Sequence, residues 1–568
     1  MEESGKKPQL VMYDVMAIQG YVFASRKLKE NIGASIIVKT LFKNDLVDSI
    51  EKYCTDNGIG EKCYSTKWKE WEKDDFKGTL TAEVLYIGGG NAMVLYDTKN
   101  TMVEVNKKLS MKVLEKTRNT LSFAVAAVDK TQSFAEDYKN LFQSLNEVKS
   151  GHIFSVPLMG ISITREGITD GLPATSISED GSALSSPAIK KREEQENCYT
   201  KGGYFSKMLG DKYKLPQDID NLGQEDGENH IAVVYIDGNN MGKTIETAIS
   251  GNKDYETAIK IIRKLSLDID NAYQDTLCEM ADYLDSNLKE GGALEKKIKR
   301  KDDKDLPLRP IVVSGDELSF IVDGRIGLPL AEYFLEKISQ KKITVNGKEV
   351  YLSACGGVAI VKSHFPFHLA YALAEELCSN AKHKAKTLAE KENIDDPGSW
   401  LDFHIVHSGV TNTLDEMRKR HYNVPGMEIA MGIASKNLTY KNYNLLWRPW
   451  KICPADNSLY EMKHFHFFRQ KILTGPEAWP RSKSKSLREQ VVKSKLEIDL
   501  ILDELKSRGH SLPTFSVNKG GFFFTGTIFG SSNTETYTTP YFDVLDTMDF
   551  YFDMAENQSE NQKEGEQP

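Results

Sequence analysis

PIVVSGDELSFIVD (310–323) holds two apolar runs on either side of an acidic turn, Ser314-Gly315-Asp316-Glu317. Apolar β-rich runs separated by a glycine-containing turn are typical of a β-hairpin. Further upstream, IAVVYID (231–237) is apolar on both of its faces, which predicts a covered central strand that ends at Asp237. The sequence predicts a long helical region between them, at roughly 241–289, and then helix 327–338, strand 349–360 and helix 367–390.

This β-α-β-β order predicts where the acidic side chains meet. With a right-handed crossover, the third strand lies between the first two, so Asp237 is expected beside the turn that holds Asp316 and Glu317. Three crowded carboxylates repel one another unless a cation bridges them. Hard oxygen ligands suit Mg²⁺ or Mn²⁺, with substrate phosphates completing the shell. We therefore predict that all three acids are metal ligands and catalytic residues for attack by a ribose 3′-hydroxyl on an α-phosphate.

Glycines beside these acids predict a phosphate-binding cradle. Gly238 and Gly315 leave room for a triphosphate to approach the backbone, and Ser314 completes the turn. An aspartate after a strand and a GDE turn are each common surface features, so the prediction depends on their joint placement. DGNNMGKT (237–244) is not a Walker A loop, because only three residues separate its glycines and that motif needs four.

The first part of the chain repeats the same plan. Strand 9–18, a helical stretch at about 21–53, two strands within 84–97, helix 101–118, strand 121–129 and helix 133–149 follow the ferredoxin-like order. We predict an α+β fold with two ferredoxin-like domains and a mixed C-terminal region. The expected divisions are 1–160, a polar connector at 161–229, 230–395, a mixed α/β region at 396–555 and a disordered polar tail at 556–568.

Composition limits the class of protein. The chain of 568 residues carries 73 basic and 82 acidic side chains, a net charge of −9, which argues against non-specific coating of nucleic acid. No apolar run approaches the ~20 residues of a membrane span, and the N-terminus has no signal-peptide core. Seven scattered cysteines without a CxxC pair fit a reducing compartment. We expect a cytoplasmic protein without a membrane partner.

Several segments together resemble one protein family. They are YDVMAIQGYVFASRKLKENIGAS (13–35), YIGGGNAMVL (86–95), YIDGNNMGK (235–243), VVSGDELSFIV (312–322), LSACGGVAI (352–360), AEELCSNAK (374–382), SWLDFHIV (399–406) and LLWRPWKI (445–452). They resemble the polymerase/cyclase large subunit of type III CRISPR effector complexes and, more distantly, GGDEF-type diguanylate cyclases. The resemblance covers most of residues 10–455 and implies two palm domains.

The resemblance also implies roles for single residues. Asp237 and Asp316 match the family's metal-binding carboxylates, Glu317 matches the second acid of its hairpin, and Lys382 matches a phosphate-contacting lysine. A solvated cation on a lysine-rich helix is the alternative interpretation of Lys382. Gly238, Asn239, Ser314 and Gly315 fall where the nucleotide is bound, although Asn239 replaces an aspartate and Ser314 replaces a glycine.

Other parts of the family pattern are absent. The hairpin of the first predicted palm, Gly88 to Asn91, carries no acid, so this palm is expected either to bind a nucleotide or only to support the second. The family's zinc-binding cysteines are missing between the palms. The chain also starts almost at the first palm and has no His-Asp dipeptide, so we expect neither an HD nuclease domain nor cleavage of single-stranded DNA.

The resemblance leaves three functions open. The first is a nucleotidyl cyclase that makes a cyclic oligonucleotide, with oligoadenylate expected, from ATP and Mg²⁺ or Mn²⁺ in antiviral defence. The second is a catalytically weak scaffold that docks with other effector subunits and guide RNA. The third, a diguanylate cyclase, requires guanine selection, which these residues do not reveal.

Overall fold

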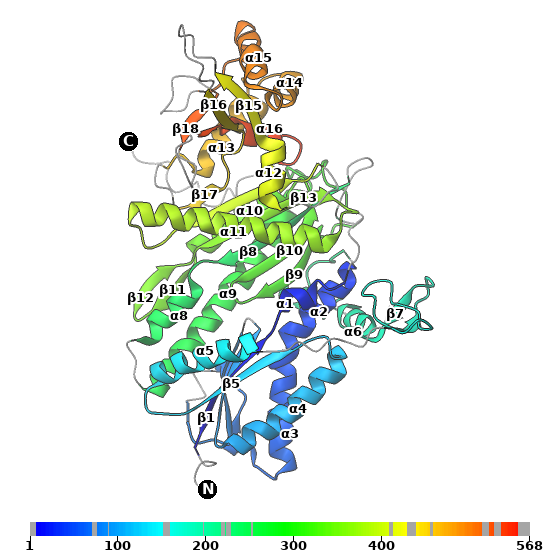
Figure 1. Cartoon of the computed structure of the whole chain (residues 1–568), viewed down its shortest axis with the longest axis vertical. Helices are drawn as coiled ribbons and strands as arrows, with labels where there is room; N and C mark the ends of the chain where they lie inside the picture. Colours follow the sequence, from blue (N-terminus) through cyan, green and yellow to red (C-terminus); the bar gives the residue numbers. More distant parts are fainter. Residues whose placement is uncertain are drawn as a thin grey trace.

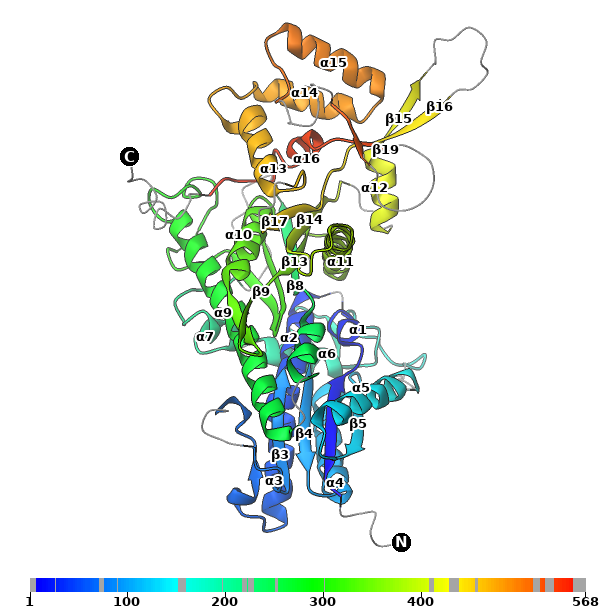
Figure 2. The ribbon, with the colours of Figure 1, turned by 90° about the vertical axis from the view of Figure 1, so that its left-hand side faces the viewer.

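The computed structural model describes residues 7–25, 27–70, 76–88, 90–151, 160–196, 198–216, 222, 229–250, 254–300, 302–407, 413–428, 439–454, 458–513, 522–526 and 536–554. The predicted tail at 556–568 lies outside these residues. Several separate sheets, with helices packed beside them, are distributed along one long axis (Figure 1), which confirms the predicted mixture of helices and strands. The N-terminal sheet lies at one end of this axis, a larger central sheet in the middle, and the C-terminal helices at the other end (Figure 2).

The N-terminal sheet has the strand order β2-β3-β4-β1-β5, with β1 antiparallel to both of its neighbours. Its strands are β1 (Gln9–Val15), β2 (Tyr64–Ser65), β3 (Ala82–Gly88), β4 (Asn91–Tyr96) and β5 (Phe123–Asp129). Its helices are α1 (Ile18–Val22), α2 (Leu28–Thr40), the π-helix η1 (Leu41–Leu46), α3 (Val47–Asp56), α4 (Lys99–Thr117) and α5 (Phe134–Gly151). Short 3-10 turns η2 (Glu61–Cys63) and η3 (Trp68–Glu70) flank β2.

Both faces of this sheet are covered. Val11 and Tyr13 point into a core formed with α2, α3 and α4, whereas Leu10 and Met12 point into a second core formed with α5 and with α9 (Tyr255–Leu288). Successive side chains of a strand point to opposite faces, so a strand that is covered on both sides is apolar throughout. This explains why QLVMYDV has no polar-apolar alternation.

The central sheet has the order β17-β14-β13-β8-β10-β9, so the third predicted strand does lie between the first two. Its strands are β8 (His230–Gly238), β9 (Leu308–Ser314), β10 (Glu317–Asp323), β13 (Ala354–Lys362), β14 (Ser399–Ile405) and β17 (Trp450–Cys453). Its helices are α8 (Met241–Ser250), α9 (Tyr255–Leu288), α10 (Gly327–Gln340) and α11 (Phe367–Glu392), and β11 (Lys342–Val345) and β12 (Lys348–Tyr351) form a separate hairpin. β14 and β17 come from the predicted C-terminal region yet extend this sheet.

Two glycines let helices approach β13 from opposite faces. A Cβ on Gly357 would lie 2.0 Å from the carbonyl oxygen of Ala374 in α11. A Cβ on Gly356 would lie 3.2 Å from Leu335 in α10. Residues 356 and 357 point to opposite faces of the strand, so α11 covers one face of the sheet and α10 the other. Asp237 is in register with Cys355 and therefore points to the α11 face.

The two remaining regions pack against these sheets. The predicted connector contains β6 (Ala174–Ile177), β7 (Ala183–Ser185), α6 (Ser186–Glu196) and α7 (Tyr204–Met208). The C-terminal region holds α12 (Leu414–Tyr422), β15 (Asn423–Glu428), β16 (Thr439–Asn444), α13 (Met462–Arg469), the π-helix η5 (Gln470–Thr474), α14 (Arg481–Val491), α15 (Lys495–Ser507), β18 (Phe524–Gly526), β19 (Thr536–Thr538) and α16 (Tyr541–Asp546). Its core is continuous with that of the central sheet. Among the described helices, none combines the length and apolar composition that crossing a bilayer requires.

A helix from each sheet reaches the other. Arg263 of α9 is completely buried, and its guanidinium donates hydrogen bonds to the carbonyl oxygens of Leu85 (2.7 Å) and Val84 (2.8 Å). The β3–β4 register shifts at this point, and a bulge leaves carbonyls without ladder partners. In return, the Ser35 hydroxyl of α2 donates to the carbonyl oxygen of Ile311 at 3.0 Å. These contacts hold the end of β1 opposite the β9–β10 turn.

Candidate active site

The acidic turn lies where the sequence predicts. Glu317 is paired with Asp237 across β10 and β8, and Ser314 is paired with Glu317 across β9 and β10. Side chains paired in this way lie on the same face of a sheet, about 5 Å apart at Cβ. Asp237 and Glu317 therefore share the face that α11 covers, and Asp316 sits in the turn beside them.

Gly238 lets the turn close over β8. A Cβ at this position would lie 2.8 Å from the Cβ of Asp316, and its backbone N–H donates to the carbonyl oxygen of Asp316 at 3.0 Å. Gly315 has a φ of +60°, which favours glycine, and nothing lies within 4 Å of its virtual Cβ. Gly315 thus leaves open space at the tip of the turn, whereas the Asp316 side chain occupies the space beside Gly238.

The predicted residues Asn239 and Lys382 have different surroundings. The buried Asn239 side chain donates to the Ser353 hydroxyl (3.2 Å) and to the carbonyl oxygen of Gly398 (2.9 Å), so its amide nitrogen holds two backbone segments together. The Lys382 ammonium donates to Oδ2 of Asp237 and to the carbonyl oxygen of Gly238, both at 2.6 Å. Burial opposes the charge on Lys382, but the Asp237 carboxylate raises the pKa of this lysine overall.

Two of the acids have strongly shifted pKa values. Burial, followed by the charge of Asp237, raises the pKa of Asp316 to about 6 and that of Glu317 to about 7. Tyr371 donates a hydrogen bond to Oε1 of Glu317 at 3.2 Å, which partly offsets this effect. Lys382 thus forms its ion pair with Asp237, and the other two carboxylates hold protons more tightly than usual.

The donor chemistry of this turn suits a hard divalent cation, which would replace those protons. Within the described parts of the chain, however, no three His, Cys, Asp or Glu side chains are arranged as a metal centre. Lys382 instead supplies the positive charge beside Asp237. The three-acid metal site predicted from the sequence stays a prediction.

A cavity of about 630 Å³ opens beside Glu317, between the two sheets. We call it the intersheet cavity. Its lining residues are Asp14, Val15, Ala17, Ile18, Gln19, Gly20, Val22, Phe23, Ser35, Val38, Lys39, Gly90, Lys149, Val312, Ser314, Glu317 and Tyr371. Part of this lining is apolar and aromatic, with the Phe23 and Tyr371 ring centroids 3.9 Å apart, and its charged residues are Asp14, Lys39, Lys149 and Glu317. A mixed lining of this size is typical of a small-molecule site.

The cavity also exposes a second aspartate–lysine pair. Asp14 ends β1 as Asp237 ends β8, and it forms an ion pair with Lys149 of α5. Its partner across β4 is Asn91, which corresponds to Glu317 in the central sheet. The N-terminal sheet thus repeats the aspartate–lysine geometry of the central sheet but without the additional acids.

A smaller cavity of about 140 Å³ lies on the other side of the acidic turn. Asp316 and Gly315 line it together with Lys43 and with apolar side chains of α8 and α9, among them Met241. The backbone N–H of Gly315 donates to Asp270 of α9 at 3.3 Å. The turn therefore separates two cavities, with Glu317 lining the larger one and Asp316 lining the smaller one.

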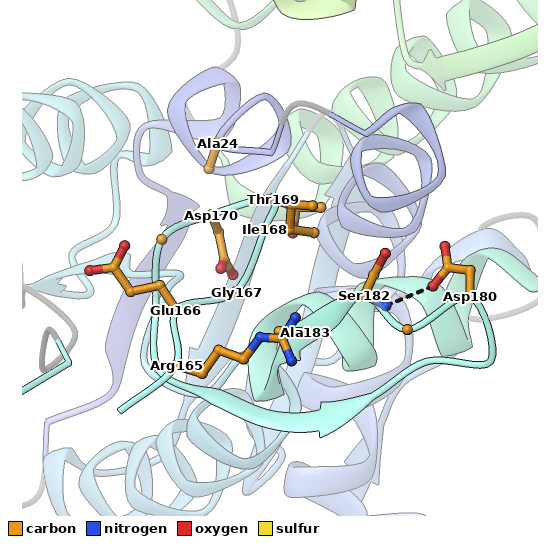
Figure 3. A pocket seen from close by; sticks show the side chains of 12 residues that line it. Ala24, Arg165, Glu166, Gly167, Ile168, Thr169, Asp170, Asp180, Ser182 and Ala183 are labelled. Carbon is orange, nitrogen blue, oxygen red and sulfur yellow. Dashed lines mark hydrogen bonds between the residues drawn. The ribbon is translucent and has the colours of Figure 1, made fainter. Parts of the chain in front are cut away.

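A third cavity, of about 650 Å³, lies outside this site (Figure 3). The loops around β6 and β7 form it, together with Ala24 of the N-terminal region. Arg165 and Glu166 lie on one side of it and Asp180 on the other, where the N–H of Ser182 donates to Asp180 at 3.0 Å. None of the acids of the β9–β10 turn lines this cavity.

Reasoning from the sequence missed four residues of the intersheet cavity: Asp14 as half of an ion pair, Lys39, Lys149 and Tyr371. Lys149 had a detectable signal, because it lies in the last helix of the first repeat, as Lys382 does in the second. Lys39 had none, since it belongs to a helix that only the docking of the two sheets brings to the acidic turn.

Comparison with known proteins identified solved structures but no sequence family. No family model matches the chain, and no curated protein matches it. Among the solved structures, a Csm1–Csm4 cassette with AMPPNP is 13% identical with a TM-score of 0.40, and the match covers 67% of this chain and 53% of that one. The cassette with cA4 is 13% identical with a TM-score of 0.40, and the match covers 71% of this chain and 55% of that one. Csm1 from T. onnurineus is 12% identical with a TM-score of 0.39, and the match covers 67% of this chain and 52% of that one.

The chain thus spans about half the length of these Csm1 structures. The solved structures that this chain resembles in fold are thus Csm1 and Csm1–Csm4 cassettes.

Proposed function

We propose that the chain binds a nucleoside triphosphate in the intersheet cavity and is a metal-dependent nucleotidyl cyclase that makes a cyclic oligonucleotide, with oligoadenylate expected, from ATP. The observation that carries this proposal is the meeting of Asp237, Asp316 and Glu317 at one turn beside the cavity. Raised pKa values of Asp316 and Glu317 are typical of acids arranged for a function rather than for stability.

The proposal includes Mg²⁺ or Mn²⁺ as the cation. Asp237 and Asp316 would hold it, with Glu317 as a further ligand or charge stabiliser. When bound, the cation would supply positive charge for the phosphates and lower the pKa values of the acids. Asp237 keeps its position through Lys382, and the open Gly315 tip leaves space for a phosphate group. The apolar wall around Phe23 would exclude water from the nucleotide.

We further propose that the two sheets belong to two ferredoxin-like palm domains with the predicted boundaries. Support comes from the strand order: β5-β1-β4-β3 in one sheet corresponds to β13-β8-β10-β9 in the other. In both, an extra helix, α5 or α11, follows the repeat and supplies the lysine. This arrangement is consistent with the family resemblance and with a role in CRISPR-type antiviral defence.

Incubation with radiolabelled ATP and Mn²⁺ tests the activity. Wild type is expected to form cyclic products, and Asp316→Asn is expected to lose at least about 100-fold of the rate, as when a group that stabilises transition-state charge is removed. Asp303→Asn is the matched control, because the Asp303 side chain is fully exposed in a loop. Absence of product from wild type with all four nucleoside triphosphates would contradict the proposal.

One observation favours a second candidate, a catalytically weak scaffold subunit. Lys382 already neutralises Asp237, and within the described residues the acids do not form a ready metal centre. As a scaffold, the chain would persist for its shape and dock with other effector subunits and guide RNA. Stable co-purification with RNA and subunits, together with bound but unconverted ATP, would favour this candidate over the cyclase.

A further inference from the structure

Lys39 lies near the end of α2, the helix that crosses from the N-terminal sheet to the central sheet. One turn before it, Ser35 anchors α2 to the backbone of Ile311 in β9. A Cβ on Gly33 would overlap the carbonyl oxygen of Lys191, so α6 holds the helix from another side. The backbone of α2 is thus held by its contacts with β9 and α6, and Lys39 of this helix lines the intersheet cavity.

The ammonium of Lys39 is buried, and it has no hydrogen-bond partner in the described part of the protein. Its contact is the ring of Tyr204, whose centroid lies 5.3 Å from Nζ. An ammonium removed from water without an anionic partner is costly, and proteins rarely keep one without a use. Burial lowers the pKa of Lys39 to about 7, although the charge of Asp270 opposes this change.

The other two lysines of the site differ from Lys39 in this respect. Lys149 is paired with Asp14, and Lys382 is paired with Asp237. Both are therefore compensated without a ligand. Among the described lysines that line the intersheet cavity, Lys39 is the one whose ammonium lacks a carboxylate within ion-pair distance. An anionic group entering the cavity would meet this lysine without having to break an existing pair.

We propose that Lys39 binds a phosphate group of the nucleotide in the intersheet cavity. The inference rests on the proposed function and deepens it: the N-terminal part of the chain provides the cation for the phosphate, and the central turn provides the acids. An ammonium offers three donors, which match the oxygens of a phosphate. The cavity is large enough for a nucleotide, and the apolar wall around Phe23 and Tyr371 would take the base. Neither sheet alone then forms the complete site.

Calorimetric titration tests this role with ATP, adenosine and inorganic tripolyphosphate, using the full chain. Lys39→Met is expected to weaken ATP and tripolyphosphate binding at least about tenfold, the value of a charge-assisted hydrogen bond. Its binding of adenosine should stay within about twofold, because the base wall is unchanged. Lys39→Arg should recover part of the loss by keeping the charge. Lys29→Met is the matched control, because Lys29 is an exposed lysine of the same helix.

The outcomes separate the two proposals. Equal ATP affinity of wild type and Lys39→Met would overturn the role of Lys39 and leave nucleotide binding intact. A different outcome is that tripolyphosphate binding depends on Lys39 but ATP binds no more tightly than tripolyphosphate. This would support the role of Lys39 in binding phosphate and count against a nucleotide as the ligand. Thermal melting excludes a folding defect, since removing a buried uncompensated charge should keep or raise the melting temperature of Lys39→Met.

Discussion

The two sheets carry the same aspartate–lysine pair in different electrostatic surroundings. Asp14 at the end of β1 is paired with Lys149 of α5, and Asp237 at the end of β8 is paired with Lys382 of α11. Across the neighbouring strand, the N-terminal sheet has Asn91 where the central sheet has Glu317. The first pair is balanced, with one acid and one base. The second lies beside two further acids, Asp316 and Glu317.

This difference explains why chemistry is expected at only one of two similar sites. A balanced ion pair can persist as a structural contact, whereas an excess of buried carboxylates requires protons or a cation. Burial, and after it the charge of Asp237, raises the pKa values of Asp316 and Glu317, as expected for crowded buried carboxylates. The same backbone plan thus supports a neutral half and an acidic half, which face each other across the intersheet cavity.

The largest expected effect is on activity. Asp237→Asn should reduce product formation from ATP by about 100-fold or more, because it removes one of the two carboxylates proposed to hold the cation. Asp14→Asn, the matching change in the N-terminal sheet, should retain most of the rate. Quantifying cyclic products with Mn²⁺ measures both. Equal losses of rate in the two variants would show that the two aspartates are equivalent and would contradict the proposed difference between the two sheets.

A second prediction concerns the docking that brings the halves together. Arg263→Met should destabilise the protein by about 3 kcal/mol, since it leaves two buried carbonyl oxygens at the β3 bulge without a donor. Denaturant unfolding measures the loss, and limited proteolysis should show cleavage between the two sheets. Arg118→Met serves as control, because Arg118 contacts Ser186 at an exposed position. Unchanged stability would mean that other contacts hold the sheets.

A third prediction concerns pH in the absence of metal. The folded pKa values of Asp316 and Glu317, about 6 and about 7, lie above their ordinary values of 3.8 and 4.5. The stability that these groups contribute is therefore complete below about pH 4 and falls as the pH rises to about 7. Glu317→Gln should recover about 1 to 2 kcal/mol at pH 8 and nothing at pH 4, after allowing for partial exposure.

Melting temperatures at a series of pH values, with a chelator present, measure this effect. In wild type, Mn²⁺ should restore stability at pH 8, because a bound cation replaces the protons. The Glu317→Gln variant should gain less from Mn²⁺. A wild-type melting temperature that rises steadily from pH 4 to 8 would contradict the predicted sign.

The smallest expected effects come from the lysines. Lys149→Met should cost about 0.5 kcal/mol, because the ion pair that it breaks is partly exposed. Lys382→Met should cost about 1 kcal/mol, since it leaves Asp237 beside two further acids. Mn²⁺ should restore the second variant and leave the first unchanged. Chemical denaturation with and without Mn²⁺ measures both, and equal losses without a metal effect would argue against the charge excess.

Most of the site could be predicted from local sequence. IAVVYID ends in Asp237 because a covered strand must change to polar residues where it leaves the sheet, and the GDE turn is equally local. The right-handed crossover rule then places these two segments side by side, as observed. Local sequence does not predict the surroundings of Asn239, because its contacts with Ser353 and Gly398 depend on segments far along the chain.

By itself, the sequence determined most strands of the two sheets, their order within each repeat and the acids of the β9–β10 turn, because hydrophobic periodicity and turn chemistry are local properties. The single strand predicted at 349–360 was wrong, since β12 and β13 are separate strands that belong to different sheets. Only the tertiary structure decided that α2 lies against β9, that α9 reaches β3, and that Lys39 and Asp14 face Glu317 across one cavity. The physical reason is that docking between sheets depends on the fit of whole surfaces, such as the close approach of Gly33 to Lys191, and no short stretch of sequence encodes that fit.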